Sequence, residues 1–172
     1  IDVVFEFGGT LDKFIGDAIM AVFGAPIQTP QDELLAVRSA LRMRERLEEI
    51  NERREERGQE IIRIGIGIHT GEAVAGYIGS SRRMEYTVVG STVNLASRIE
   101  QLTKRIGTDI LLSDQTRELV AESIDAEEVE PQVIRGMTTP VRTWSLRGMR
   151  EPRTLPLAES LPKAEASDSE AK

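Results

Sequence analysis

The chain has 172 residues, 40% of them hydrophobic and 30% charged, which is typical of one globular domain with a sizeable core. Its formal net charge of −7 argues against a nucleic-acid surface, and no apolar run reaches the length of a membrane span. Because the sequence contains no cysteine, disulfides and thiolate metal sites are excluded. We therefore expect a cytoplasmic domain, alone or within a larger sensor or membrane protein, that contacts neither nucleic acid nor membrane.

The first two predicted elements are strands. Residues 10–22 are mostly apolar and contain Gly16 and Asp17, which predicts a strand pair that turns there. Thr29, followed by proline, glutamine and aspartate, is typical of a helix start. Apolar residues at helical spacing then continue this helix until Gly58.

A second group of strands follows. Isoleucines alternate with other residues over 62–68, which predicts a strand, and Gly65 and Gly67 indicate close approach of another backbone on one face. Further strands are predicted at 73–78 and 86–89.

The last part of the domain is predicted to be mixed. A helix begins near Thr92 with Ser91 as its N-cap and ends at Gly107. A short strand at 109–112, a helix opened by Ser113, and strands at 129–134 and 141–146 complete the pattern. Beyond that, proline, alanine, serine and glutamate dominate, so we expect a domain over 1–148 and a disordered acidic tail or linker over 149–172.

Several side chains are candidates for chemistry. Asp17 beside a glycine at a turn suits an oxygen ligand for Mg²⁺, although aspartate also favours turns for purely structural reasons. Asn94 and Arg98 are four residues apart on one predicted helix face and could grip phosphate oxygens, or could be ordinary surface residues. Arg82 lies in a predicted loop, where it could hold a triphosphate or simply be solvated. His69 is the only histidine, so we expect it to be structural.

Three segments together resemble the class III adenylate and guanylate cyclase catalytic domains. These segments are GTLDKFIGDAIMAVFGAP at 9–26, GIGIHTG at 65–71 and YTVVGSTVNLASR at 86–98. The resemblance covers the chain to about residue 146 and is closest to bacterial adenylate cyclases with threonine at the base-recognition position. It implies an α+β fold with a ferredoxin-like βαββαβ core and additional strands and helices, in which residues 1–7 end a helix.

The resemblance also implies a mechanism. Such domains form head-to-tail homodimers, and each site uses two Mg²⁺ or Mn²⁺ ions to convert ATP into 3′,5′-cyclic AMP and pyrophosphate. By similarity Asp17 is a metal ligand, and Arg82 and Arg135 contact the phosphates. The partner copy supplies Lys13 and Thr87 for the adenine base.

Two residues of one helix are implied to act on the reacting groups. By similarity Asn94 orients the ribose, and Arg98 stabilises the charge that develops on the α-phosphate. Guanylate cyclases carry other residues in place of Lys13 and Thr87, so this pair favours ATP.

The sequence departs from the family pattern at three places. The opening strand with the first metal aspartate has no counterpart, so the sequence is expected to begin inside the domain. Ser91 replaces the usual aspartate or asparagine, and Met137 follows Arg135-Gly136 where the family has a second basic residue.

Two other functions stay open at this point. One is a cyclase of altered base preference. The other is a catalytically silent cyclase-like module that binds nucleotide or a partner for regulation. The first metal aspartate in the full-length gene would favour an enzyme, and a residue there that cannot bind metal would favour the silent module.

Overall fold

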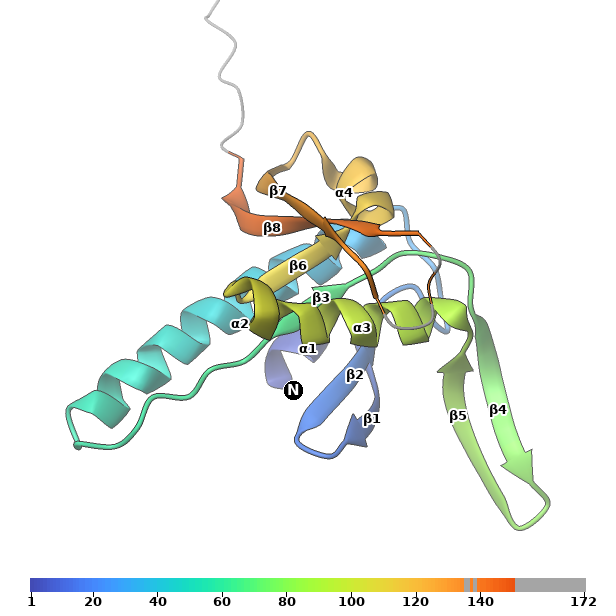
Figure 1. The fold of residues 1–172 in the computed structure, drawn as a ribbon. Helices are drawn as coiled ribbons and strands as arrows, with labels where there is room; N and C mark the ends of the chain where they lie inside the picture. The colour runs from blue at the N-terminus through green and yellow to red at the C-terminus, as the bar shows by residue number, and fades with distance from the viewer. Residues whose placement is uncertain (135–136, 138, 151–172) are drawn as a thin grey trace, which may run out of the picture.

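The computed structural model describes residues 1–134, 137 and 139–150. Each helix along this part of the chain is followed by one to three strands (Figure 1). Its helices are α1 (Asp2–Glu6), α2 (Asp32–Glu55), α3 (Ser91–Ile106) and α4 (Asp114–Val120). Its strands are β1 (Thr10–Ile15), β2 (Ala18–Val22), β3 (Ile66–Ile68), β4 (Val74–Ser80), β5 (Arg83–Val89), β6 (Ile110–Ser113), β7 (Ile124–Gln132) and β8 (Val141–Met149).

The main sheet has four strands in the order β3-β6-β8-β7. Strands β3 and β6 are parallel, with Ile66 opposite Ile110, and α3 belongs to the crossover that connects them. Strands β6 and β8, and β7 and β8, pair antiparallel. The α+β fold predicted from the sequence is thereby confirmed.

Strand β6 is the centre of the core. Ile110 and Leu112 pack with residues of α2, whereas Leu111 between them packs with residues of α3. Because successive side chains of a strand point to opposite faces, the two long helices cover opposite faces of the sheet (Figure 1). This explains why β6 is buried at all four positions and apolar at the first three.

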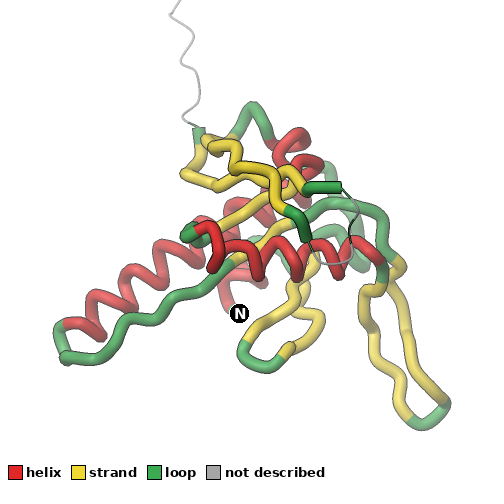
Figure 2. Tube along the Cα trace, viewed as in Figure 1, coloured by secondary structure: helices red, strands yellow, loops and turns green. Residues whose placement is uncertain are grey.

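Two antiparallel hairpins, β1–β2 and β4–β5, form separate two-stranded sheets. Both project from the same side of the molecule, away from β7 and β8 (Figure 2). The turn between β1 and β2 lies at Gly16 and Asp17 as predicted. The two hairpins are where most of the predicted site residues lie.

The predicted close approach at Gly67 is confirmed. A Cβ atom at this position would lie 2.6 Å from the Ala96 carbonyl oxygen of α3 and also against the Glu100 backbone nitrogen. Glycine therefore lets the α3 backbone pack directly on β3.

Several helix boundaries agree with the prediction. Residues 2–6 form a helix, Gly107 ends α3 in the left-handed conformation, and the Ser113 side chain caps α4 by accepting from the Thr116 backbone nitrogen. Within the described ranges, no helix is long and apolar enough to cross a membrane.

Three local predictions are wrong. Strand β3 is confined to Ile66–Ile68, because only these residues pair with β6. Ser91 is the first residue of α3 rather than its cap, a position that Gly90 takes. Thr29 was predicted to begin α2, but the helix begins at Asp32. The Asp32 carboxylate accepts from both the backbone nitrogen and the hydroxyl of Thr29, each at 2.7 Å.

Candidate active site

The predicted site residues lie on the two hairpins and on α3. Arg135 is outside the described residues, so its predicted contact with phosphate stays a prediction. The others are Lys13 on β1, Asp17 in the β1–β2 turn, Arg82 in the β4–β5 turn, Thr87 on β5, and Asn94 and Arg98 on α3.

The two residues expected to read the base lie around one atom. The Thr87 hydroxyl donates to Asp12 Oδ2 at 2.9 Å, and the Lys13 ammonium lies 3.3 Å from the same oxygen. The Lys13 side chain is 42% exposed, whereas Thr87 is buried, with 7% of its surface accessible. A ligand could therefore contact Thr87 only through this small accessible part, beside a more accessible ammonium group.

Asp17 is exposed at the end of the β1–β2 hairpin. Gly16 precedes it with a φ of +62°, a conformation that favours glycine and makes the tight turn possible. Its carboxylate is accessible, as a metal ligand must be. However, no group of three histidine, aspartate or glutamate side chains among the described residues could hold a metal ion. Asp17 alone does not make a complete two-metal site.

Asn94 and Arg98 lie on the same side of α3, because four residues separate them. Asn94 is exposed and Arg98 is partly exposed. Neither side chain forms a hydrogen bond or an ion pair with another described residue, including Lys13, Asp17 and Thr87. Within the part of the chain that the structure describes, their polar groups are therefore available to a ligand.

The two arginines of the β4–β5 hairpin differ in their surroundings. Arg83 donates through Nε to Glu85 Oε1 at 2.9 Å. Arg82 lies exposed in the turn, and its side chain has no hydrogen bond or ion pair within the part of the chain that the structure describes. Arg82 is therefore the arginine that is available to an anion.

His69 is partly buried, and its Nδ1 lies 2.9 Å from Ser113 Oγ. Burial lowers the pKa of His69, because the charged imidazolium loses its hydration. Ser113 is also the N-cap of α4, so this histidine lies within a structural hydrogen-bonded cluster.

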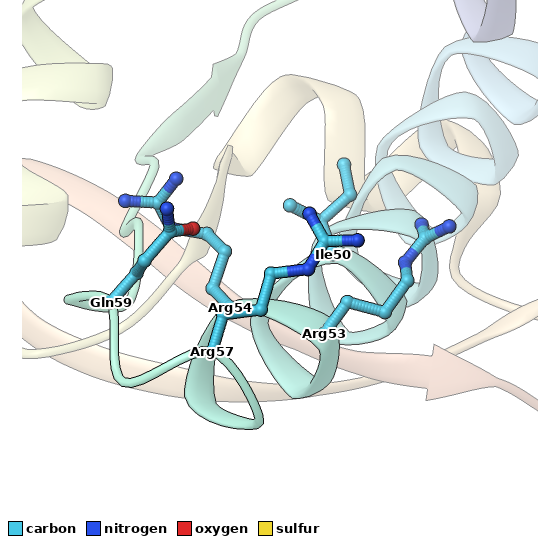
Figure 3. Close-up of a pocket in the computed structure, with 5 residues that line it drawn as sticks. All are labelled: Ile50, Arg53, Arg54, Arg57 and Gln59. Carbon is cyan, nitrogen blue, oxygen red and sulfur yellow. The ribbon is translucent and has the colours of Figure 1, made fainter.

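Two surface pockets do not include any predicted site residue. One, of about 290 Å³, lies at the end of α2 and is shown in Figure 3. Its lining residues are Ile50, Arg53, Arg54, Arg57 and Gln59. Arg54 donates through Nε to the Glu60 carbonyl oxygen at 2.7 Å, so its guanidinium ties the helix end to the following loop. The second pocket lies between α2 and the end of β8.

Asp12 contacts residues of the candidate site, and the sequence motifs did not single it out. Only 3% of its side chain is exposed, and it contacts both residues of the predicted base-reading pair. An aspartate inside an otherwise apolar strand pattern was the available signal, because aspartate is unfavourable in strands unless it has a partner.

Comparison with known proteins identifies the family of this chain. The profile of the adenylate and guanylate cyclase catalytic domain matches residues 11–148. Adenylate cyclase 1 of Rhizobium meliloti is 38% identical over 130 residues, which cover 76% of this chain and 19% of that protein. An adenylate cyclase of Anabaena cylindrica is 42% identical over 113 residues, 63% of this chain and 22% of that protein. The chain thus spans about a fifth of the length of these two relatives.

Solved cyclase structures have the same fold. The adenylyl cyclase CyaB of P. aeruginosa superimposes with a TM-score of 0.78 and 30% identity, covering 90% of this chain and 78% of that one. The guanylyl cyclase Cya2 superimposes with a TM-score of 0.74 and 39% identity, covering 90% and 77%. The chain belongs to the adenylate and guanylate cyclase catalytic domain family.

Proposed function

We propose that this domain is an adenylate cyclase that converts ATP into 3′,5′-cyclic AMP and pyrophosphate, at sites shared by two copies of the chain. The observation that carries the proposal is the convergence of Lys13 and Thr87 on one oxygen of Asp12. An ammonium donor beside a hydroxyl suits the edge of adenine, which presents a ring acceptor next to an amino group. The adenylate cyclases among the relatives support the same activity.

A second copy is proposed because one chain leaves the site open. Asn94 and Arg98 have no described partner, and both hairpins expose apolar side chains. The most exposed are Phe14 and Ile15 on β1, and Val74, Tyr77 and Met84 on the β4–β5 hairpin, from 54% to 73% exposed. Apolar surface of this kind is typical of protein interfaces. A head-to-tail homodimer would cover it and form two equivalent sites.

In the proposed site, Lys13 donates to the adenine ring and Thr87 lies at the 6-amino group. Asn94 holds the ribose, and Arg98 stabilises the negative charge that grows on the α-phosphate during attack by the 3′-hydroxyl. Arg82 and Arg135 bind the departing phosphates.

Divalent metal belongs to the proposal as well. Mg²⁺ or Mn²⁺, two per site, would neutralise the triphosphate. Asp17 is the one proposed ligand within the described residues, and it does not complete such a site by itself. Removal of divalent metal with a chelator should therefore abolish product formation, and its return should restore it.

The test is direct product formation. The complete gene product, incubated with ATP or with GTP in the presence of Mg²⁺ or Mn²⁺, should yield cyclic AMP and pyrophosphate from ATP. Formation of cyclic GMP as the main product would support the alternative of a different base preference. Tight nucleotide binding without either cyclic product would support the silent regulatory module.

A further inference from the structure

Asp12 is a carboxylate with almost no exposure to solvent. Its side chain is 3% exposed, and burial of a charged group is unfavourable unless partners compensate for the lost hydration. Three groups do so here. Oδ1 accepts from the Val88 backbone nitrogen at 3.2 Å, while Oδ2 accepts from the Thr87 hydroxyl and pairs with Lys13.

An irregularity of β1 directs the Asp12 side chain towards Thr87. Leu11 pairs with Ala21 and Lys13 pairs with Met20, so Asp12 is an extra residue without a counterpart on β2. Such a β-bulge breaks the regular alternation of side chains and can re-aim one of them. The bulge explains how the side chains of the adjacent residues Asp12 and Lys13 can contact each other. Asp12 Oδ2 thereby contacts both the Lys13 ammonium and the Thr87 hydroxyl.

The hydrogen bond to Asp12 uses the single hydroxyl hydrogen of Thr87. A threonine hydroxyl has one hydrogen to donate and two lone pairs to accept with, whereas an ionised carboxylate only accepts. With its hydrogen committed to Asp12 Oδ2, Thr87 Oγ1 can only accept from a further partner. Lys13 beside it can only donate.

This acceptor–donor pair complements adenine and opposes guanine. The 6-amino group of adenine is a donor and its N1 an acceptor, whereas guanine presents an O6 acceptor and a protonated N1. We propose that Asp12 is a positioning residue that fixes Thr87 as an acceptor and so makes the site select ATP over GTP. This inference rests on the proposed function and deepens it, because Asp12 would set the base preference without touching the base.

The test uses Asp12→Asn in the complete gene product. The asparagine amide can donate to Thr87 Oγ1, which frees the hydroxyl hydrogen to face the O6 of guanine. The ratio of kcat/KM for ATP to that for GTP should fall about tenfold, the scale of one hydrogen bond. In a Thr87→Val background the same change should leave the ratio nearly constant, because Asp12 then has no hydroxyl to orient.

Two controls keep the result specific. Asp114 also accepts from two side chains, those of Trp144 and Arg142, but lies in α4 away from both hairpins. Asp114→Asn should lower stability and leave the ATP:GTP ratio unchanged. Purine riboside triphosphate, which lacks the 6-amino group, should be used about tenfold less well than ATP by the unaltered protein. This second control needs no variant to fold.

The outcomes separate the two proposals. If Asp12→Asn lowers kcat/KM for ATP and for GTP equally, Asp12 does not orient Thr87. The same holds if Asp12→Asn shifts the ATP:GTP ratio as much in the Thr87→Val background as in the unaltered protein. Equal use of ATP and purine riboside triphosphate by the unaltered protein would also overturn the inference. If the unaltered protein forms no cyclic product, the proposed function fails, and the same ratios measured by competitive binding of ATP and GTP decide the role of Asp12.

Discussion

Thr87 and Asp12 are 75 positions apart in the sequence, and the Thr87 hydroxyl donates to Asp12 Oδ2 at 2.9 Å. This hydrogen bond links the β4–β5 hairpin to the β1–β2 hairpin. The Val88 backbone nitrogen donates to the other oxygen of Asp12, so the hairpins are joined by two hydrogen bonds, and Lys13 lies beside Oδ2. The proposed base-reading pair therefore depends on the relative placement of the hairpins, not on either strand alone.

Asp17→Ala should abolish cyclic nucleotide formation and leave the fold intact. The side chain is exposed at a turn, so its removal takes away no core contact, whereas the loss of a metal ligand removes several kcal/mol of transition-state stabilisation. Product formation and thermal unfolding measure the two effects. Asp125→Ala, which removes another exposed carboxylate on β7, is the matched control and should stay active. Near-normal turnover of Asp17→Ala at saturating Mg²⁺ would leave Asp17 as a turn residue only.

Arg98→Ala and Asn94→Ala should each lower kcat by roughly 10²–10³, the scale for loss of one preorganised charge-stabilising donor. Their effect on KM should be smaller, because both contacts strengthen as charge develops. Steady-state kinetics with ATP measure this. Lys104→Ala, in the last turn of the same helix, serves as the control and should change neither constant. A pure KM effect in both variants would remove them from the reacting centre.

Gly67→Ala should lower the free energy of unfolding by about 1–3 kcal/mol, the usual cost of overpacking. The new Cβ would lie 2.6 Å from the Ala96 carbonyl oxygen, so α3 would have to move away from β3. Urea unfolding measures the change. Gly76→Ala is a suitable comparison, since a Cβ there would meet no atom within 4 Å. Equal losses in the two variants would show that the close approach of α3 is not what requires glycine.

The pH dependence of stability should contain a contribution from His69. Burial lowers its pKa in the folded state below the value of 6.5 expected in the unfolded state. The unfolded chain therefore binds more protons, and the free energy of unfolding falls as the pH falls through 6.5 towards the folded pKa. Measured by urea unfolding, the free energy of unfolding should fall more between about pH 7.5 and about pH 5.5 for the unaltered protein than for His69→Asn. An equal or larger loss in the variant would contradict this assignment.

Much of the fold could be predicted because local signals agree with it. Gly16 and Gly107 take left-handed conformations at a turn and at a helix end, and Gly67 meets a helix backbone as expected. The long strand predicted at 62–68 is absent because its isoleucines up to Ile64 have no strand beside them. An alternating pattern shows that a segment could be a strand, but pairing depends on the four residues of β6.

The candidate site residues could be named from the sequence one at a time, but their geometry could not. Lys13 and Thr87 are candidates through the family resemblance, whereas the contact of Asp12 with both of them depends on a bulge in β1 that no local pattern indicated. The proposed site also uses residues of a second copy, and contacts between copies are not displayed by one sequence.

The shared site is the central claim, and subunit mixing tests it most directly. If Asp17 serves a site from one copy and Arg98 serves it from the other, each single variant has two broken sites in its homodimer. A heterodimer of Asp17→Ala and Arg98→Ala chains collects both defects in one site and leaves the other intact. With random exchange about half the dimers are hybrids, so two-fold symmetry predicts recovery of about a quarter of normal activity.

A control pair gives the mixing experiment its contrast. Lys13→Glu and Arg98→Ala should not rescue each other, because both residues serve a site from the same copy. The measurement is cyclic AMP formation in each mixture after subunit exchange has been verified. Shared sites predict activity near a quarter of normal in the Asp17→Ala and Arg98→Ala mixture and none above the single variants in the control. If the mixture of Asp17→Ala and Arg98→Ala chains shows no recovery of activity despite proven subunit exchange, the sites are not shared between copies.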